Sequence, residues 1–315
     1  MPGPSNFPAG FQNGLTIRGI PLSVTNPGEV FWVNSTTVLA KGGIGSSNGN
    51  KGTYQQPFAT IDYAIGQCLA SRGDVIMVMP GHTETVSGAA GIALDVAGVA
   101  IIGLGRGSLR PSINFTATAS TMTMSAANCL IHNLLLTGGV DAVVSPLVVS
   151  AADCVISSCT LRDVTGQMTN GILTTADATR LKILDHEHDG ATAAGTDAGI
   201  AIVGGDGIVI DGLRMDGNFA VGGIDVRTTA TTDLEVRNVV FRTRNNADIF
   251  LVDTITASTG MIGPNLYLRL NENAANVTEA ITGATFVVFD DVYVVNLANE
   301  KAMLINWTAS TDAIV

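Results

Sequence analysis

Five segments of the chain align on one another at a nearly constant spacing. They are residues 129–136 (CLIHNLLL), 154–161, 181–188, 208–215 and 234–241, and a weaker copy lies at residues 99–104. Their central aliphatic residues follow one another after 25, 27, 27 and 26 positions: Ile131, Ile156, Ile183, Ile210 and Val236. Repetition at this length is typical of stacked supersecondary units, because each unit buries its apolar face against the next.

The columns of this alignment indicate strands and corners. Apolar residues recur at the central position and two positions before it, which is the spacing of a strand with one buried face. Two positions after the centre, the column holds residues that tolerate left-handed backbone or bond their own main chain at a bend: Gly103, Asn133, Ser158, Asp185, Gly212 and Asn238. Further strands are expected upstream, as at Met122 with Met124. We therefore predict an all-β, single-stranded right-handed parallel β-helix with coils about 4.8 Å apart.

Residues 31–73 are expected to form an amino-terminal cap made of a strand, a Gly-rich loop and a capping helix. Residues 56–69 (QPFATIDYAIGQCL) have apolar residues at helical spacing, and residues 73–81 (GDVIMVMPG) follow as the first core strand with a Pro-Gly turn. This run resembles the start of right-handed β-helix domains in phage structural proteins, which include capsid decoration and tailspike-like proteins. The resemblance spans residues 31–243 and implies the same fold, with a place in a virion.

Apart from the cap, the chain divides into an amino-terminal arm, the repeat region and a carboxy-terminal region. Residues 1–30 contain five prolines and read as an extended anchoring arm, in which Phe7 and Phe11 are candidates to fill pockets on a partner. Residues 74–243 are expected to be β-helix coils. After residue 243 the repeat fades, and residues 244–315 are expected to form carboxy-terminal strands or a cap that also contributes to oligomer contacts.

Composition restricts the partners. The formal charge is -11, which argues against a nucleic-acid partner because such proteins need a basic face. No apolar run approaches the roughly 20 residues of a membrane span, so no membrane partner is expected. Hydrophobic residues make up 46% of the chain and charged residues only 14%, and this excess apolarity favours an oligomer, which we predict to be a homotrimer. The amino terminus lacks a signal peptide pattern, so synthesis in a host cytoplasm is expected.

The candidate catalytic carboxylates are better explained by a structural role than by catalysis. Cleavage of a polysaccharide needs two carboxyl groups roughly 5 to 9 Å apart. The repeat region offers seven: Asp185, Glu187, Asp189, Asp211, Asp216, Asp225 and Asp233. Asp185 and Asp211 lie at or beside the corner column, where turn chemistry accounts for them. The signatures of polygalacturonases are absent, and no calcium-binding carboxylates beside a basic residue can be assigned. We therefore expect no catalytic residue and no cofactor.

Two histidines are the remaining candidates for a metal site. His186 and His188 lie two positions apart on a strand and could hold a transition metal together with a carboxylate. Their columns are otherwise apolar, so the alternative is that both are neutral core residues or lie on an outward bulge. No metal site is predicted.

Cys129 and Cys154 stack in adjacent coils, where either a disulfide or two reduced core thiols would fit, and reduced thiols are preferred.

These observations favour a non-enzymatic phage virion structural protein. The leading hypothesis is a capsid decoration or cement protein that binds the major capsid protein, or another virion protein, through its amino-terminal arm. Two alternatives stay open: a tailspike-like polysaccharide depolymerase, and a non-catalytic tail or head fibre that binds a receptor. A spike would need a groove lined by aromatic and acidic residues, and aromatic residues make up only 5% of the chain.

Overall fold

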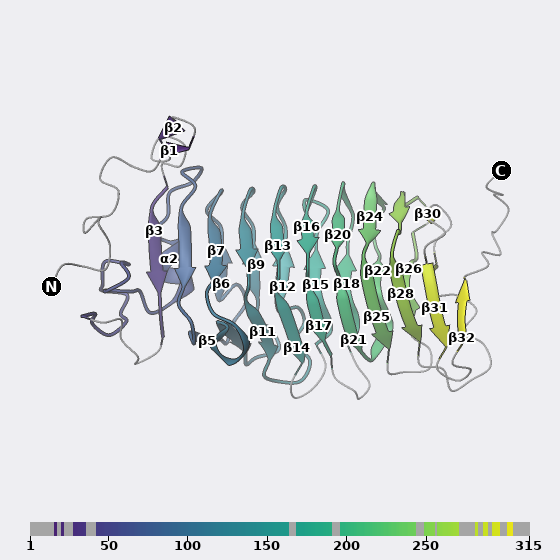
Figure 1. Cartoon of the computed structure of the whole chain (residues 1–315), viewed down its shortest axis with the longest axis horizontal. Helices are drawn as coiled ribbons and strands as arrows, with labels where there is room; N and C mark the ends of the chain where they lie inside the picture. Colours follow the sequence, from purple (N-terminus) through teal and green to yellow (C-terminus); the bar gives the residue numbers. More distant parts are fainter. Residues whose placement is uncertain are drawn as a thin grey trace.

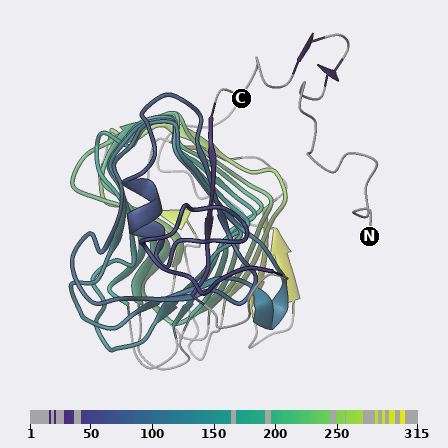
Figure 2. The ribbon, with the colours of Figure 1, turned by 90° about the vertical axis from the view of Figure 1, so that its left-hand side faces the viewer.

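The chain winds into a stack of coils, and successive coils contribute strands to three long parallel sheets (Figure 1). Viewed from its amino-terminal end, the stack shows the coils superposed on one another around a common core (Figure 2). The computed structural model describes residues 16–17, 20–21, 28–35, 42–163, 168–190, 196–243, 249–255, 257–270, 281–282, 286–288, 292–296 and 301–304. The predicted all-β fold, a right-handed parallel β-helix, is confirmed.

Sheet 1 consists of β3 (Val30–Val33), β4 (Val75–Val78), β7 (Ala100–Gly103), β10 (Leu130–His132), β13 (Val155–Ser157), β16 (Lys182–Leu184), β20 (Val209–Asp211), β24 (Leu234–Arg237), β27 (Gly260–Ile262) and β30 (Phe286–Val288). Sheet 2 consists of β5 (Thr83–Val86), β8 (Ser112–Phe115), β11 (Leu135–Gly138), β14 (Thr160–Asp163), β17 (Glu187–Asp189), β21 (Arg214–Gly217), β25 (Val239–Thr243), β28 (Leu266–Leu270), β31 (Val292–Asn296) and β32 (Lys301–Leu304). Sheet 3 consists of β6 (Ile92–Leu94), β9 (Met122–Met124), β12 (Leu147–Val149), β15 (Asn170–Thr174), β18 (Thr196–Ile202), β22 (Phe219–Val226), β26 (Ile249–Asp253) and β29 (Ile281–Thr282). Two short pairs lie outside these sheets, β1 (Thr16–Ile17) with β2 (Ile20–Pro21) and β19 (Gly205–Asp206) with β23 (Thr231–Thr232).

The repeat positions form the core ladder that the sequence predicts. The five central residues of the aligned segments are register partners in sheet 1, and all five are fully buried. The next corner turns through left-handed backbone, with φ of 56° at Asn133, 49° at Asp185 and 53° at Asn238. Asn, Asp and Gly adopt this conformation at low cost, which explains the column of such residues.

A glycine column lets large side chains enter the core. Gly171, Gly199 and Gly223 follow one another in sheet 3, and a Cβ atom at Gly199 or Gly223 would lie 2.5 or 2.6 Å from the side chain of Met215 or Phe241. A Cβ atom at Gly171 would lie 2.9 Å from His188 Nδ1. At these three positions, a large side chain of sheet 2 occupies the space that a side chain would need in sheet 3.

The amino-terminal cap contains a shorter helix than the apolar spacing predicts. Helix α2 covers Ile61–Ile65, with Thr60 as its N-cap, and it buries Ile61, Ala64 and Ile65 over the first coil. Gly66 follows the helix directly, which limits its length. A 3₁₀ turn, η1, covers Gly107–Leu109 after β7.

The sheets continue beyond the predicted end of the coils at residue 243. Strands β28 and β31 pair in parallel with their predecessors, and only β32 turns back antiparallel. Leu266 and Leu268 keep the period-two burial of the earlier coils. The cap strand β3 likewise pairs directly with β4, so sheet 1 begins inside the predicted cap. Among the described residues, no helix has the length and apolarity needed to cross a membrane.

Candidate functional site

Three of the seven candidate carboxylates lie at corners. Asp185 and Asp233 have left-handed backbone, with φ of 49° and 51°. Asp211 accepts hydrogen bonds from Arg237 Nε at 2.8 Å and from Asn238 Nδ2 at 2.7 Å. Burial alone would raise the pKa of Asp211, but these two donors outweigh it and the pKa is lowered. The structure thus gives all three residues a role in the corners.

The outer face of sheet 2 carries three more of the candidates. Two columns of side chains run along this face in register across β14, β17, β21, β25 and β28. The first column is Thr160, Glu187, Arg214, Val240 and Tyr267. The second column is Arg162, Asp189, Asp216, Arg242 and Arg269. Arginines and carboxylates therefore meet between neighbouring coils.

Each of these three carboxylates is near an arginine of an adjacent coil. Arg162 Nε lies 3.0 Å from Asp189, Arg242 Nη1 lies 3.4 Å from Asp216, and Arg214 Nε lies 3.8 Å from Glu187. Glu187 also accepts a hydrogen bond of 3.3 Å from the Thr160 hydroxyl group. The charge of these carboxylates is balanced within the wall, which does not favour their use as acid and base.

A shallow hollow of about 300 Å³ lies at the carboxy-terminal end of this face, over β21, β25 and β28. Its outward side chains are Arg214, Asp216, Val240, Arg242, Tyr267 and Arg269, and we call it the basic hollow. The arginines were not singled out in the sequence. Arg214 lies four positions after its central residue, inside the aligned segment 208–215, and Arg242 lies six positions after its central residue, so extending the repeat alignment by one column would have included both.

Asp225 has a different environment, on the outer side of sheet 3. Its side chain is only 4% exposed and lies 3.3 Å from Arg227 Nη1, while Arg227 Nη2 donates to Asn170 Oδ1 at 2.5 Å. Burial raises the pKa of Asp225; Arg227 opposes this rise, and Asp197 and Asp253 add to it. A carboxyl group with a raised pKa beside a cation is a candidate acid or base.

His186 and His188 both point into the core, so the outward bulge considered for this strand is not observed. Each is 1% exposed, and none of their ring nitrogens has a hydrogen-bond partner among the described residues. Burial lowers the pKa of His186 to about 3, with His188 and Arg110 adding to the effect, and burial lowers the pKa of His188 to about 4. His188 packs against Phe219 at a ring distance of 5.3 Å. Both histidines are therefore neutral core residues.

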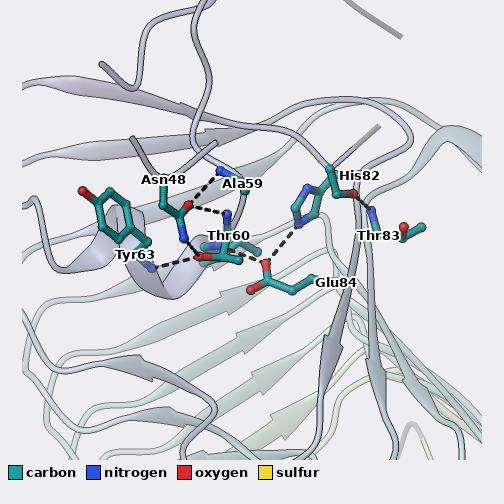
Figure 3. Close-up of polar contacts among 9 residues, drawn as sticks. Asn48, Ala59, Thr60, Tyr63, His82, Thr83 and Glu84 are labelled. Atoms are coloured by element: carbon teal, nitrogen blue, oxygen red, sulfur yellow. Dashed lines mark hydrogen bonds and ion pairs between the residues drawn. The ribbon is translucent and has the colours of Figure 1, made fainter. Parts of the chain in front are cut away.

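A partly buried polar network joins the amino-terminal cap to the start of β5 (Figure 3). His82 Nε2 and Glu84 Oε2 are 3.1 Å apart, and the same oxygen accepts the Ile61 N–H at 2.9 Å. Asn48 Oδ1 accepts the Ala59 N–H at 2.9 Å, which joins the Gly-rich loop to the start of helix α2. These bonds serve the first turn of the helix and the loop beside it, so the network closes the end of the core.

Asp74 of the GDVIMVMPG run anchors the cap in a similar way. Its buried carboxylate accepts bonds from the Glu29 N–H and the Leu69 N–H, both at 2.8 Å, and from Arg72. Burial tends to raise its pKa, but these donors lower it below the ordinary value. The aspartate of this motif is thus explained by the fold.

The remaining site predictions have mixed outcomes. Phe7 and Phe11 lie outside the described residues, so their anchoring role stays a prediction. All four cysteines are buried free thiols, and burial raises the pKa of Cys154 and Cys159 to about 11. Within the described part of the chain, no group of three or more His, Cys, Asp or Glu residues is arranged to hold a metal ion.

The outer face of sheet 1 is apolar near the cap. Most of its outward residues from β3 to β13 are apolar, half-buried and in register, and we call these the apolar stripe: Trp32, Val75, Met77, Ala100, Ile102, Leu130 and Val155. Two polar residues, His132 and Ser157, lie beside the stripe on β10 and β13, with His132 Nδ1 3.3 Å from Ser157 Oγ. Further along the same face the outward residues become charged, at Lys182, Asp211, Glu235 and Arg237. The stripe is therefore confined to the first coils.

Comparisons with known proteins identify no family. No protein-family model matches the chain. No curated protein matches it either. Among solved structures, a rhamnogalacturonan lyase aligns with a TM-score of 0.49 and 10% sequence identity, over 89% of this chain and 90% of that one. A similarity at this level does not indicate a shared activity.

Proposed function

We propose that the chain is a non-enzymatic phage virion structural protein, a capsid decoration protein whose β-helix forms a rigid body. The observation that carries this proposal is the pairing of the outer-wall carboxylates. Glu187, Asp189 and Asp216 each face an arginine of a neighbouring coil, and Asp185, Asp211 and Asp233 serve the corners. The resemblance of the cap residues to phage β-helix proteins supports the virion setting.

The apolar stripe supports the predicted homotrimer. A contiguous apolar patch on a soluble protein marks a contact surface. Copies of a chain with formal charge -11 repel one another over most of their surface, and the stripe carries no charged residue. It is therefore the face on which identical copies meet at the lowest electrostatic cost. The arm of residues 1–30 then connects the trimer to the major capsid protein.

Truncation tests the anchoring role. Deleting residues 1–20 should leave the far-UV circular dichroism of the β-helix unchanged but abolish incorporation into particles that lack the full-length chain. The double variant Asp185→Ala, Glu187→Ala is the matched control, and it should still be incorporated. Normal incorporation of the truncated chain would refute the anchor, and incorporation would then have to use the body of the β-helix.

A second candidate function, a tailspike-like polysaccharide depolymerase, is favoured by Asp225. Its raised pKa and its contact with Arg227 suit a proton-transfer group. The test is release of reducing ends from host polysaccharide by the full chain, by Asp225→Asn and by the control Asp189→Asn. Activity that only Asp225→Asn abolishes would replace the decoration role with the depolymerase role.

A further inference from the structure

We propose that the basic hollow on sheet 2 is a binding site for a carboxylate-bearing saccharide chain. The site is separate from the surface proposed for the trimer, because it lies on a different sheet from the apolar stripe and toward the opposite end of the coils (Figure 1). It uses side chains from three consecutive coils, β21, β25 and β28.

Charge identifies an anionic ligand. The hollow contains three arginines and one aspartate, so it is locally basic on a chain whose formal charge is -11. Arg214 is 72% exposed and 3.8 Å from Glu187, which is too far for a hydrogen bond. Arg269 is exposed and has no ion pair within the described residues. Guanidinium donors therefore remain for a carboxylate, which arginine binds in a bidentate manner.

The placement of two of these arginines strengthens this conclusion. Arg242 and Arg269 are register partners on neighbouring strands, and such strands are about 4.8 Å apart. Like charges opposite one another in a sheet are destabilising. Asp216 lies 3.4 Å from Arg242 Nη1. An anion that bridges both guanidinium groups would relieve the remaining repulsion, so the pair is suited to a bound carboxylate.

The apolar residues of the hollow favour a saccharide. Tyr267 is 53% exposed and Val240 is 48% exposed, and the two are register partners in the column beside the arginines. A tyrosine ring with one wet face offers both an apolar surface and a hydroxyl group. A sugar ring presents C–H groups on one face and hydroxyl groups around its edge, and a uronic acid adds the carboxylate.

Two other polyanionic occupants fit less well. A peptide strand binds by adding to a sheet edge, but β21, β25 and β28 each pair with a neighbour on both sides. An acidic peptide would be held by side chains alone. Nucleic acid requires an extended basic surface, and the negative charge of the whole chain repels it.

Titration of the full chain with alginate oligosaccharides tests the site. The double variant Arg242→Gln, Arg269→Gln should weaken binding about 100-fold, which is about tenfold for each charged contact of roughly 1.4 kcal/mol. Tyr267→Ala should weaken it about tenfold. Arg180→Gln is the matched control, because Arg180 is an exposed arginine that pairs with Asp153 outside the hollow, and its affinity should equal that of the wild type.

Three other probes are titrated for comparison: neutral dextran oligosaccharides, a poly-glutamate peptide and single-stranded DNA. The proposal requires that alginate bind and that dextran of equal length not bind. Absence of alginate binding at millimolar concentration would overturn it, as would equal affinity of wild type and the double arginine variant. If the peptide or DNA binds as tightly as alginate and Tyr267→Ala leaves all affinities unchanged, the ligand is a general polyanion and the saccharide assignment is wrong.

Discussion

The outer faces of sheets 1 and 2 differ although the two sheets share one core and one coil spacing. Near the cap, the outward positions of sheet 1 are apolar, as at Ile102 and Leu130. Toward the other end of the stack, sheet 2 carries arginines, carboxylates and an exposed tyrosine, Tyr267. Inward residues on both sheets are mostly apolar, and the buried polar exceptions on sheet 2 include His188, Asp163 and Thr243.

This difference separates the requirements of the fold from those of contact. Strand pairing and inward packing are the same on both sheets, so neither explains why one outer face is apolar and the other charged. Outward residues are free to vary as long as they tolerate a strand. The contrast therefore indicates two contact surfaces, one suited to an apolar partner and one to an anionic ligand.

The largest effect is expected in the core that the two sheets share. Ile183→Asp places an unpaired carboxylate at a fully buried position of β16, and it should cost about 4 kcal/mol or more of unfolding free energy. Leu184→Asp, on the outward side of the same strand, is the control and should cost much less. Chemical denaturation measures both. Equal losses would show that strand orientation does not decide the role of a residue here.

The sequence predicted this inner ladder because one physical rule fixes it. A coil must return to the same place after each turn, so the central residues and the corner residues, such as Asn133 and Asn238, recur in fixed columns. The outer faces obey no such rule. Single residues in outward columns have many acceptable identities, so the alignment could predict their positions but not what they contact.

Tyr267 and Arg269, at the carboxy-terminal end of the hollow, could not be predicted from the repeat because the repeat spacing changes there. Val236 pairs with Ile262, 26 positions later, but Phe241 pairs with Leu268, 27 positions later. One extra residue enters the corner between them, so the repeat spacing shifts. Tyr267 and Arg269 therefore fall out of the sequence columns, while the structure keeps them in register with Val240 and Arg242.

The apolar stripe should control assembly. Ile102→Asp adds a charge to the middle of the stripe, and it should convert the predicted trimer into monomers at micromolar concentration. Asn114→Asp adds the same charge to the outer face of sheet 2 in the same coil and should leave the oligomer intact. Multi-angle light scattering distinguishes the two. A wild-type monomer would mean that the stripe is covered in another way.

The histidine pair should make the fold sensitive to acid on the sheet 2 side of the core. The folded pKa values of about 3 and 4 lie below the unfolded value of about 6.5, so the unfolded chain binds protons more tightly. Their contribution to stability is present above pH 6.5 and is lost as the pH falls toward 4. At pH 5 the loss relative to neutral pH is about 2 kcal/mol for each histidine.

Replacing the pair by the apolar residues of the next coil tests this pH dependence. His186→Leu with His188→Met copies Leu213 and Met215, which follow in the same columns. The variant should lose less stability than the wild type between pH 7 and pH 5, as measured by denaturation at each pH. An unchanged pH profile would show that other groups dominate acid unfolding.

The smallest effect is expected on the charged face itself. The side chains of Arg162 and Asp189 are 48% and 46% exposed, so water screens their ion pair and Arg162→Ala should cost no more than about 0.5 kcal/mol. The double variant Arg162→Ala, Asp189→Ala completes a thermodynamic cycle that isolates the coupling between them. A small coupling means that the charges of sheet 2 add little to the stability of the coils, which leaves recognition as the reason for their pattern. A coupling above about 1 kcal/mol would instead mean that the cross-coil ion pairs hold the coils together, and the contrast with sheet 1 would then reflect stability on one face and assembly on the other.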